Sequence, residues 1–266
     1  MKRLAGERGG AVAPTLQRQP LAQPAIPTAG RIASLLSVGL NREAMNELQY
    51  AQRVWGDSPQ LQATIAATHK RLGNVRAGIN AMKRAYPQYL AAGGETLPSE
   101  ILKVIFPVDF WPLLQKYSKQ RGLDPFVVAA LVAQESNFDP VVVSHADAYG
   151  LMQILPRTGR SYARKLGVKP FSTRRLKEAD VNVRLGTQIF ADEIRKYGGV
   201  HFALAAYNAG GSRVVAWQRE RPGLPQDEFI DDIPFPETQN YVKRILGTAE
   251  DYRYLYSSES DQDSKR

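Results

Sequence analysis

The chain has 266 residues, of which 43% are hydrophobic and 23% are charged. That length and balance allow one large globular domain or two small ones. The sequence contains no cysteine, which excludes disulfides, thiol chemistry and cysteine-based zinc or iron–sulfur sites. The three histidines, His69, His145 and His201, are scattered along the chain, so we predict neither a metal site nor a cofactor.

The net charge is +9 and the isoelectric point is about 9.7. Such a charge favours an acidic partner, although it can also serve solubility alone. Lysine and arginine are spread along the whole chain without a nucleic-acid-binding motif, so nucleic acid is not an expected partner. The longest apolar run, residues 126–133, is too short to span a bilayer. Membrane association is therefore not indicated.

Residues 1–29 are rich in Gly, Pro and Gln, and we expect them to form a disordered lead. They contain no sustained apolar segment, so no signal peptide is visible. From residue 30 onward the apolar residues follow helical spacing, which predicts helices near residues 58–72 and 75–86 as well. Gly39 and Gly73 separate paired helices and lie 73 − 39 = 34 residues apart. This is the period of tetratricopeptide repeats, but a generic array of helical hairpins explains it equally well.

Glycines and prolines between residues 93 and 107 indicate a boundary. We therefore predict a repeat-like helical linker domain over 30–107, a compact helical domain over 108–256, and a flexible polar tail over 257–266. Strand signals are weak, although Val141–Val143 could form a short extended piece. The overall fold class is all-α.

A helix beginning after Asp124, with Pro125 in its first turn, is predicted to carry Glu135. Its apolar stripe includes Leu131 and Val132, and helical spacing places Glu135 on the same face. Burial of a carboxyl group raises its pKa, as a general acid requires. Periodicity alone slightly favours the alternative that Glu135 reaches solvent at a frayed helix end.

Four sequence blocks, found in order, resemble the catalytic domain of the soluble lytic transglycosylase family. They are Glu135-Ser136-Asn137-Phe138-Asp139-Pro140, Gly150-Leu151-Met152-Gln153-Ile154-Leu155-Pro156, Ala206-Tyr207-Asn208-Ala209-Gly210, and Ile233-Pro234-Phe235-Pro236-Glu237-Thr238 with Tyr241-Val242. One block would be weak evidence, whereas four in order are strong. The resemblance covers roughly residues 110–256, and the preceding helices resemble the superhelical linker of large family members.

The resemblance implies a lysozyme-like helical fold and cleavage of the β-1,4 bond between N-acetylmuramic acid and N-acetylglucosamine in peptidoglycan, with 1,6-anhydro products. It implies that Glu135 is the catalytic residue. The implied substrate-binding residues are Ser144, Gln153, Tyr207, Asn208, Glu237 and Tyr241. It further implies glycan strands as partner and a periplasmic location. We expect the protein to be a monomer.

Each motif also has a purely structural interpretation. Leu151 and Met152 are better explained as core residues than as site residues. Tyr207 and Asn208 could simply lie at the end of a helix. Glu237 could stabilise the start of a helix by interacting with its dipole. Two positions depart from the family: Asp147 stands where members often have Gly, and Gln239 where they often have Arg.

Glycosidases usually need two carboxylates, but no second one is convincing. Asp139 is expected in a turn, Asp147 in a loop, and Asp180 as a helix cap. We therefore predict that Glu135 works alone, first as acid and then as base. Tyr207 and Tyr241 are candidates for stacking on sugars, with Trp217 a weaker one. The alternatives are a hydrolytic muramidase and a non-catalytic peptidoglycan-binding scaffold.

Overall fold

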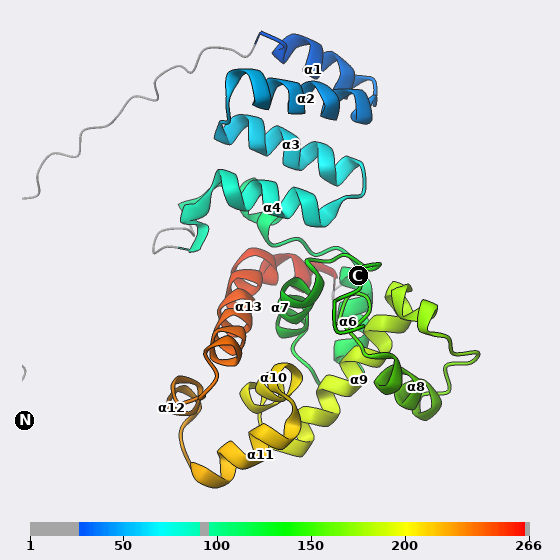
Figure 1. Ribbon diagram of the computed structural model, residues 1–266, viewed down its shortest axis with the longest axis vertical. Helices are drawn as coiled ribbons and strands as arrows, with labels where there is room; N and C mark the ends of the chain where they lie inside the picture. Colours follow the sequence, from blue (N-terminus) through cyan, green and yellow to red (C-terminus); the bar gives the residue numbers. More distant parts are fainter. Residues whose placement is uncertain (1–26, 91–95, 264–266) are drawn as a thin grey trace, which may run out of the picture.

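The computed structural model describes residues 27–90 and 96–263, and the regular elements within those ranges are all helices (Figure 1). Two isolated β-bridges join Val143 to Tyr149 and Tyr149 to Ile154, so the expected extended piece is reduced to these contacts. The predicted all-α fold is confirmed. Residues 1–26 of the expected lead lie outside the described residues, and a helix already begins at Ala29.

Four helices form a stacked array at one end of the molecule (Figure 1). They are α1 (Ala29–Ser37), α2 (Asn41–Trp55), α3 (Pro59–Arg71) and α4 (Val75–Ala85). They make two hairpins, and Gly39 (φ 78°) and Gly73 (φ 76°) follow the first helix of each. Glycine suits both places because it adopts positive φ without steric cost. The 34-residue spacing in the sequence therefore reflects equivalent turns in consecutive hairpins.

The junction after the array contains two short helices, η1 (Pro87–Leu90) and α5 (Ser99–Ile105). The sequence analysis treated this proline-bounded stretch only as a boundary and missed α5. Leu102 and Ile105 are buried, so packing stabilises a seven-residue helix that would be marginal alone.

The rest of the chain forms a helical body below the array (Figure 1). It comprises α6 (Trp111–Lys119), α7 (Pro125–Ser136), α8 (Pro156–Lys165), η3 (Thr173–Lys177), α9 (Ala179–Tyr197), α10 (Val200–Ala209), α11 (Gly211–Glu220), α12 (Gln226–Asp231) and α13 (Pro236–Asp263). Helix α7 is central, because it packs against both α6 and α13. Pro112 lies in the first turn of α6, so it starts this helix rather than breaking one.

Helix α13 continues through Asp263, beyond the domain end that we placed at residue 256. Two of its tyrosines reach back to the junction: the Tyr252 hydroxyl donates to the carbonyl of Pro107 and the Tyr256 hydroxyl to that of Phe106, each at 2.9 Å. The last helix thus fixes the start of the body. Among the described residues, no helix has the length and apolar character needed to cross a membrane.

Candidate active site

A cavity of about 770 Å³ brings together all seven site residues named from the sequence. They come from the end of α7, the following loop, the end of α10 and the start of α13. The lining consists of Gln134, Glu135, Ser144, Ala146, Ala148, Gln153, Leu155, Tyr207, Asn208, Glu237, Asn240, Tyr241 and Arg244. Glu135 is the lining carboxyl that lies deepest in the fold, because Glu237 is exposed and Glu135 is partly buried.

The local sequence explains why α7 ends directly after Glu135, at Ser136. The Asp124 side chain accepts a hydrogen bond from the Phe126 amide at 2.8 Å, which caps the start of the helix as expected. At the other end, Asn137 (φ 48°) and Phe138 (φ 59°) both adopt the left-handed conformation. This conformation costs a residue with a side chain roughly 1–2 kcal/mol. Phe138 is only 1% exposed, so burial of its ring offsets that cost and holds the turn.

The carboxyl group of Glu135 has the properties of a general acid. Burial raises its pKa to about 7, and a hydrogen bond from Tyr241 opposes the rise. The Tyr241 hydroxyl donates this bond to Oε1 of Glu135. A carboxyl group that is half protonated near neutral pH can both give and take a proton. The frayed, solvent-exposed alternative for Glu135 is therefore wrong.

Ser136 ties the end of α7 to the loop that carries the second motif. Its Oγ lies 3.1 Å from the carbonyl of Val132 and 2.9 Å from that of Leu151. Leu151 and Met152 are fully buried, which confirms that they are core residues. Ser136 is therefore the structural partner of Glu135 in the first motif, a role that the sequence did not reveal.

Gly150 permits the loop to pass close to η3 and to Asn182 on α9. It has φ 74°, and a Cβ atom there would lie 2.2 Å from the carbonyl oxygen of Leu176. Gln153 also has positive φ (45°), and its Nε2 donates to the Gly150 carbonyl at 2.9 Å. The side chain of Gln153 is thus held against the cavity floor.

Asn182 on α9 holds the same loop through hydrogen bonds of its side-chain amide. Its Oδ1 accepts from the Met152 amide at 2.8 Å, and its Nδ2 donates to the carbonyls of Tyr149 (2.8 Å) and Leu176 (2.6 Å). From the other side, the Tyr207 hydroxyl donates to the Met152 carbonyl at 2.6 Å. The sequence analysis missed Asn182, whose only signal was a polar residue on the buried face of a helix.

The remaining site residues are also held by local contacts. Ser144 Oγ accepts from the Ala148 amide at 3.1 Å, and Asn208 Oδ1 accepts from the Thr238 hydroxyl at 2.7 Å. Glu237 lies in the first turn of α13. It is exposed and lines the cavity, which is compatible with both interpretations given above.

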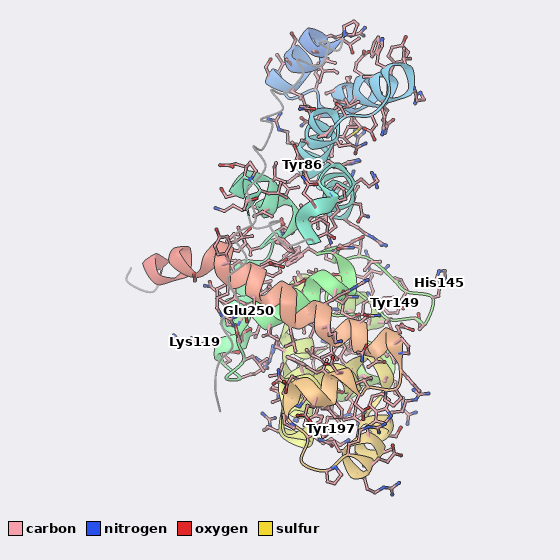
Figure 2. The ribbon with its side chains drawn as sticks, turned by 90° about the vertical axis from the view of Figure 1, so that its left-hand side faces the viewer. Tyr86, Lys119, His145, Tyr149, Tyr197 and Glu250 are labelled. Carbon is pink, nitrogen blue, oxygen red and sulfur yellow. The ribbon has the colours of Figure 1, made fainter. Side chains whose placement is uncertain are left out.

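The two departures from the family lie outside the cavity lining. Asp147 has φ 60°, a conformation natural to Gly and tolerated by Asp, which accounts for the exchange. Gln239 uses its Nε2 to donate to the Asp231 carbonyl at 2.5 Å. Figure 2 shows that His145, close to Asp147 in sequence, projects away from the helical body on the loop after α7.

Trp217 is not available to a sugar. It is 6% exposed and packs edge-on against Phe235, with ring centroids 5.4 Å apart, so its prediction as a stacking residue was wrong. Tyr241 is 7% exposed, which leaves its hydroxyl, rather than its ring face, as the group directed at the site.

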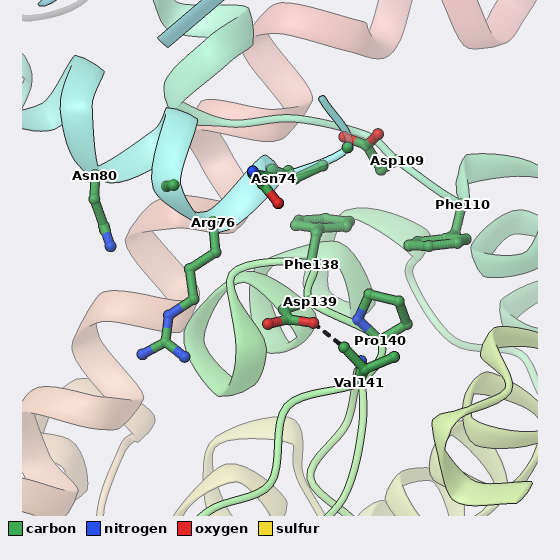
Figure 3. Close-up of a pocket in the computed structure, with 12 residues that line it drawn as sticks. Asn74, Arg76, Asn80, Asp109, Phe110, Phe138, Asp139, Pro140 and Val141 are labelled. Carbon is green, nitrogen blue, oxygen red and sulfur yellow. Dashed lines mark hydrogen bonds between the residues drawn. The ribbon is translucent and has the colours of Figure 1, made fainter. Parts of the chain in front are cut away.

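The carboxylates considered as partners for Glu135 lie elsewhere. Asp139 borders a second cavity of about 690 Å³, between the start of α4 and the turn after α7, and accepts a hydrogen bond from the Val141 amide at 3.0 Å (Figure 3). Asp180 accepts from the Tyr117 hydroxyl at 2.8 Å. It lies in the first turn of α9, whose N-cap is Glu178, so Asp180 does not cap the helix.

The structure contains a further buried carboxyl group, that of Glu193 on α9. Burial raises its pKa to about 7, and its Oε2 is buried without a hydrogen-bond partner among the described residues. Its charge contributes to the raised pKa of both Tyr207 and Tyr241. Glu193 does not line the cavity, so it acts on the site only through its electrostatic field.

Known proteins resemble this chain over roughly half of its length. The family model named transglycosylase SLT domain matches residues 112–230. The soluble lytic murein transglycosylase of Escherichia coli K12 is 32% identical over 153 residues, which are 56% of this chain and 24% of that protein. A putative soluble lytic murein transglycosylase of Haemophilus influenzae is 36% identical over 135 residues, or 50% and 23% of the two chains. The chain thus spans about a quarter of the length of these relatives.

Solved structures extend the similarity into the helical array. An inactive mutant of lytic transglycosylase Slt from Pseudomonas aeruginosa has a TM-score of 0.66 at 30% identity, covering 85% of this chain and 35% of that one. A complex of the 70-kDa soluble lytic transglycosylase with bulgecin A has a TM-score of 0.65 at 27% identity, covering 92% and 38%. The family resemblance of the four motifs and the lysozyme-like helical fold that it implied are confirmed. Residues 112–230 of this chain match the transglycosylase SLT domain family, and the matched relatives and solved structures are lytic transglycosylases.

Proposed function

We propose that this chain is a lytic transglycosylase that cleaves the β-1,4 bond between N-acetylmuramic acid and N-acetylglucosamine in peptidoglycan. The observation that carries the proposal is the partly buried Glu135, with a pKa raised to about 7, in a cavity lined by residues of all four family motifs. Two relatives named soluble lytic murein transglycosylase, one of them putative, support the proposal.

In the first step, Glu135 acts as the acid. Its proton passes to the bridging oxygen, the bond from that oxygen to C1 of the muramyl residue breaks, and positive charge develops at C1. The N-acetyl group of the same sugar can stabilise that charge, as in substrate-assisted glycosidases. Tyr241 remains a hydrogen-bond donor to Oε1, because its own pKa is raised well above the usual value by burial and by Glu135.

In the second step, the Glu135 carboxylate acts as the base. It takes the proton of the C6 hydroxyl while that oxygen attacks C1 and closes the 1,6-anhydro ring. Water is not consumed, and Glu135 returns to its protonated form. The intramolecular hydroxyl has a high effective concentration, so it outcompetes water.

A single carboxylate is sufficient for this sequence of steps. Asp139, the candidate nearest in sequence, borders a different cavity and is engaged in its own turn. Glu237 shares the cavity but is exposed, so it lacks the buried surroundings of Glu135. We therefore assign Glu237, with Ser144, Gln153, Tyr207 and Asn208, to substrate binding.

The substrate class also suggests where the protein works. Peptidoglycan carries lactyl and peptide carboxylates, and the net charge of +9 suits such an anionic polymer. We propose a monomer that acts on glycan strands in the periplasm. The division into a helical linker over 30–107 and a catalytic domain over 108–256 is part of this proposal.

Mass spectrometry of digested peptidoglycan tests the reaction. Wild-type protein is expected to release products with 1,6-anhydromuramyl ends, and Glu135→Gln to release none. Glu228→Gln, the same change at an exposed position on α12, is the matched control and is expected to retain activity. Reducing ends in place of anhydro ends would establish a hydrolytic muramidase, and binding without cleavage by the wild type would establish a scaffold.

A further inference from the structure

The positive charge of the chain is concentrated in one segment, residues 156–177. This segment contains eight lysines and arginines and neither aspartate nor glutamate. Outside it, 35 − 8 = 27 basic residues nearly balance the 26 acidic ones. Basic residues therefore occur along the whole chain, but almost all of the net charge of +9 comes from this segment.

The segment folds as α8, η3 and the loop between them, and α8 packs against both η3 and α9. Figure 1 shows α8 at the edge of the body, on the side away from α12 and α13. The buried side of α8 carries Gly159 and Ala163. Arg157, Arg160 and Arg164 are exposed, and their helical spacing places them together on one face. The three arginines thus form a row about 10 Å long.

Acidic side chains neutralise only two of the eight cations. Lys165 pairs with Asp192 at 2.5 Å and Arg175 with Glu178 at 3.1 Å. The other six cations form no ion pair with a described residue, and we call them the basic surface: Arg157, Arg160, Arg164, Lys169, Arg174 and Lys177. Five of the six are exposed. Neighbouring like charges repel one another, so the basic surface favours a partner that carries repeated negative charges.

The basic surface adjoins the loop that lines the Glu135 cavity. Leu155 lines this cavity, is 47% exposed and is the N-cap of α8, so Arg157 follows it in the first turn of the helix. At the other end of the segment, the Nζ atom of Lys177 lies 5.7 Å from the centroid of the Tyr149 ring, which belongs to the same loop. A polymer that leaves the cavity past Leu155 therefore meets the row of arginines on α8.

We propose that the basic surface binds the part of an anionic glycan strand that lies outside the Glu135 cavity. The proposal rests on the proposed function, which supplies a polymer with carboxylates on its repeating units. Arginine suits such groups because guanidinium binds both oxygens of a carboxylate. No residue of the basic surface lines the cavity, so the surface acts on binding of the strand and on its rate of association, not on the cleavage step.

The first measurement is binding to insoluble peptidoglycan by cosedimentation, with the Glu135→Gln protein as parent so that no cleavage occurs. Adding Arg157→Gln, Arg160→Gln and Arg164→Gln together is expected to weaken binding about tenfold at low salt, because three modest charge contributions are lost. The difference should shrink at high salt, which screens exposed charges. A muramyl disaccharide, the probe for the cavity alone, is expected to bind both proteins equally.

Kinetics give an independent readout in protein that retains Glu135. The variant with the three arginine changes on α8 is expected to raise KM for long glycan strands about tenfold and to leave kcat unchanged. A fall in kcat with KM unchanged would show that α8 affects the cleavage step, and would overturn the proposal.

The matched control removes the same charge from exposed positions on α2, α6 and α11, through Arg53→Gln, Lys119→Gln and Arg219→Gln together. It is expected to bind peptidoglycan as the parent does. An equal loss in the control and in the α8 variant would mean that only net charge matters, and would overturn the proposal. Binding that depends on the α8 arginines with phosphatidylglycerol vesicles but not with peptidoglycan would also overturn it. Failure of the proposed function shows separately, as the absence of anhydro products from the wild type on the same peptidoglycan.

Discussion

The Tyr241 hydroxyl donates a hydrogen bond to Oε1 of Glu135, across 106 positions of the chain. This contact orients the carboxyl group and favours its ionised form, against the larger effect of burial. Removing it has two consequences that can be measured separately.

Tyr241→Phe is expected to lower kcat/KM about 10- to 100-fold, because a hydrogen bond to a charged group is worth about 1.5–3 kcal/mol. The pH above which activity declines is also expected to rise, because the pKa of Glu135 increases further when the Tyr241 hydroxyl is removed. The measurement is the rate of anhydro-product release as a function of pH. Tyr254→Phe, on the same helix but 69% exposed, should change neither quantity.

The pH dependence of the wild type follows from Glu135. Its protonated form is required to start the reaction, and its pKa is about 7. We expect kcat/KM to fall about tenfold per pH unit above pH 7, as the acid form is lost. A kcat/KM that stays constant from pH 6 to pH 9 would contradict the assignment of Glu135 as the acid.

Glu193 predicts a pH dependence of stability. Its pKa is about 7 in the folded protein and 4.5 in the reference state, so the folded state holds more protons between these values. The free energy of unfolding should therefore fall as pH rises from about 4.5 to 7, by up to about 3 kcal/mol from this group. The pKa of Glu135 is also raised, so Glu135 likewise lowers the free energy of unfolding as pH rises over this range.

Glu193→Gln should remove the Glu193 part of that slope, because the amide remains neutral at every pH. The variant is expected to gain stability relative to wild type at pH 8 and little at pH 4, as measured by urea unfolding at both values. The exposed control Glu228→Gln should show the wild-type slope. If the free energy of unfolding of Glu193→Gln changed with pH as it does in the wild type, Glu193 would not be protonated in the folded protein.

A comparison of Gly150 with Gly167 tests how tightly the loop that carries Gly150 is packed. Both have positive φ, but a Cβ atom meets the Leu176 carbonyl only at Gly150, while Gly167 has open space. Gly167→Ala should cost about 1–2 kcal/mol, the strain of the left-handed conformation. Gly150→Ala should cost roughly 1–3 kcal/mol more from steric overlap, as measured by denaturant unfolding. Equal losses would show that the loop relaxes away from the Leu176 carbonyl on η3.

Local sequence signals predicted the parts of the site that depend on nearby residues. Asp124 and Pro125 marked the start of α7, and the apolar stripe placed Glu135 toward the core. The four motifs then named seven residues that line one cavity. Each motif carries its own turn or helix end, so its residues are positioned largely by their neighbours in sequence.

Contacts between distant segments were not predictable in this way. Asn182 holds a loop 30 residues away, and Lys83 approaches Arg244 from another part of the chain. Periodicity indicates which face of a helix is buried but not which helix covers it. For the same reason Trp217 was mistaken for a cleft residue, and the buried Glu193 was overlooked.

The hydroxyls of Tyr252 and Tyr256, which donate to the carbonyls of Pro107 and Phe106 inside the core, bear on where the chain can be divided. A fragment that starts at residue 112, where the family match begins, would lack both acceptors and lose two buried hydrogen bonds, at about 0.5–1.5 kcal/mol each. A fragment that starts at residue 96 would keep both pairs. The smallest unit that folds well should therefore include Phe106 and Pro107, although no motif lies there.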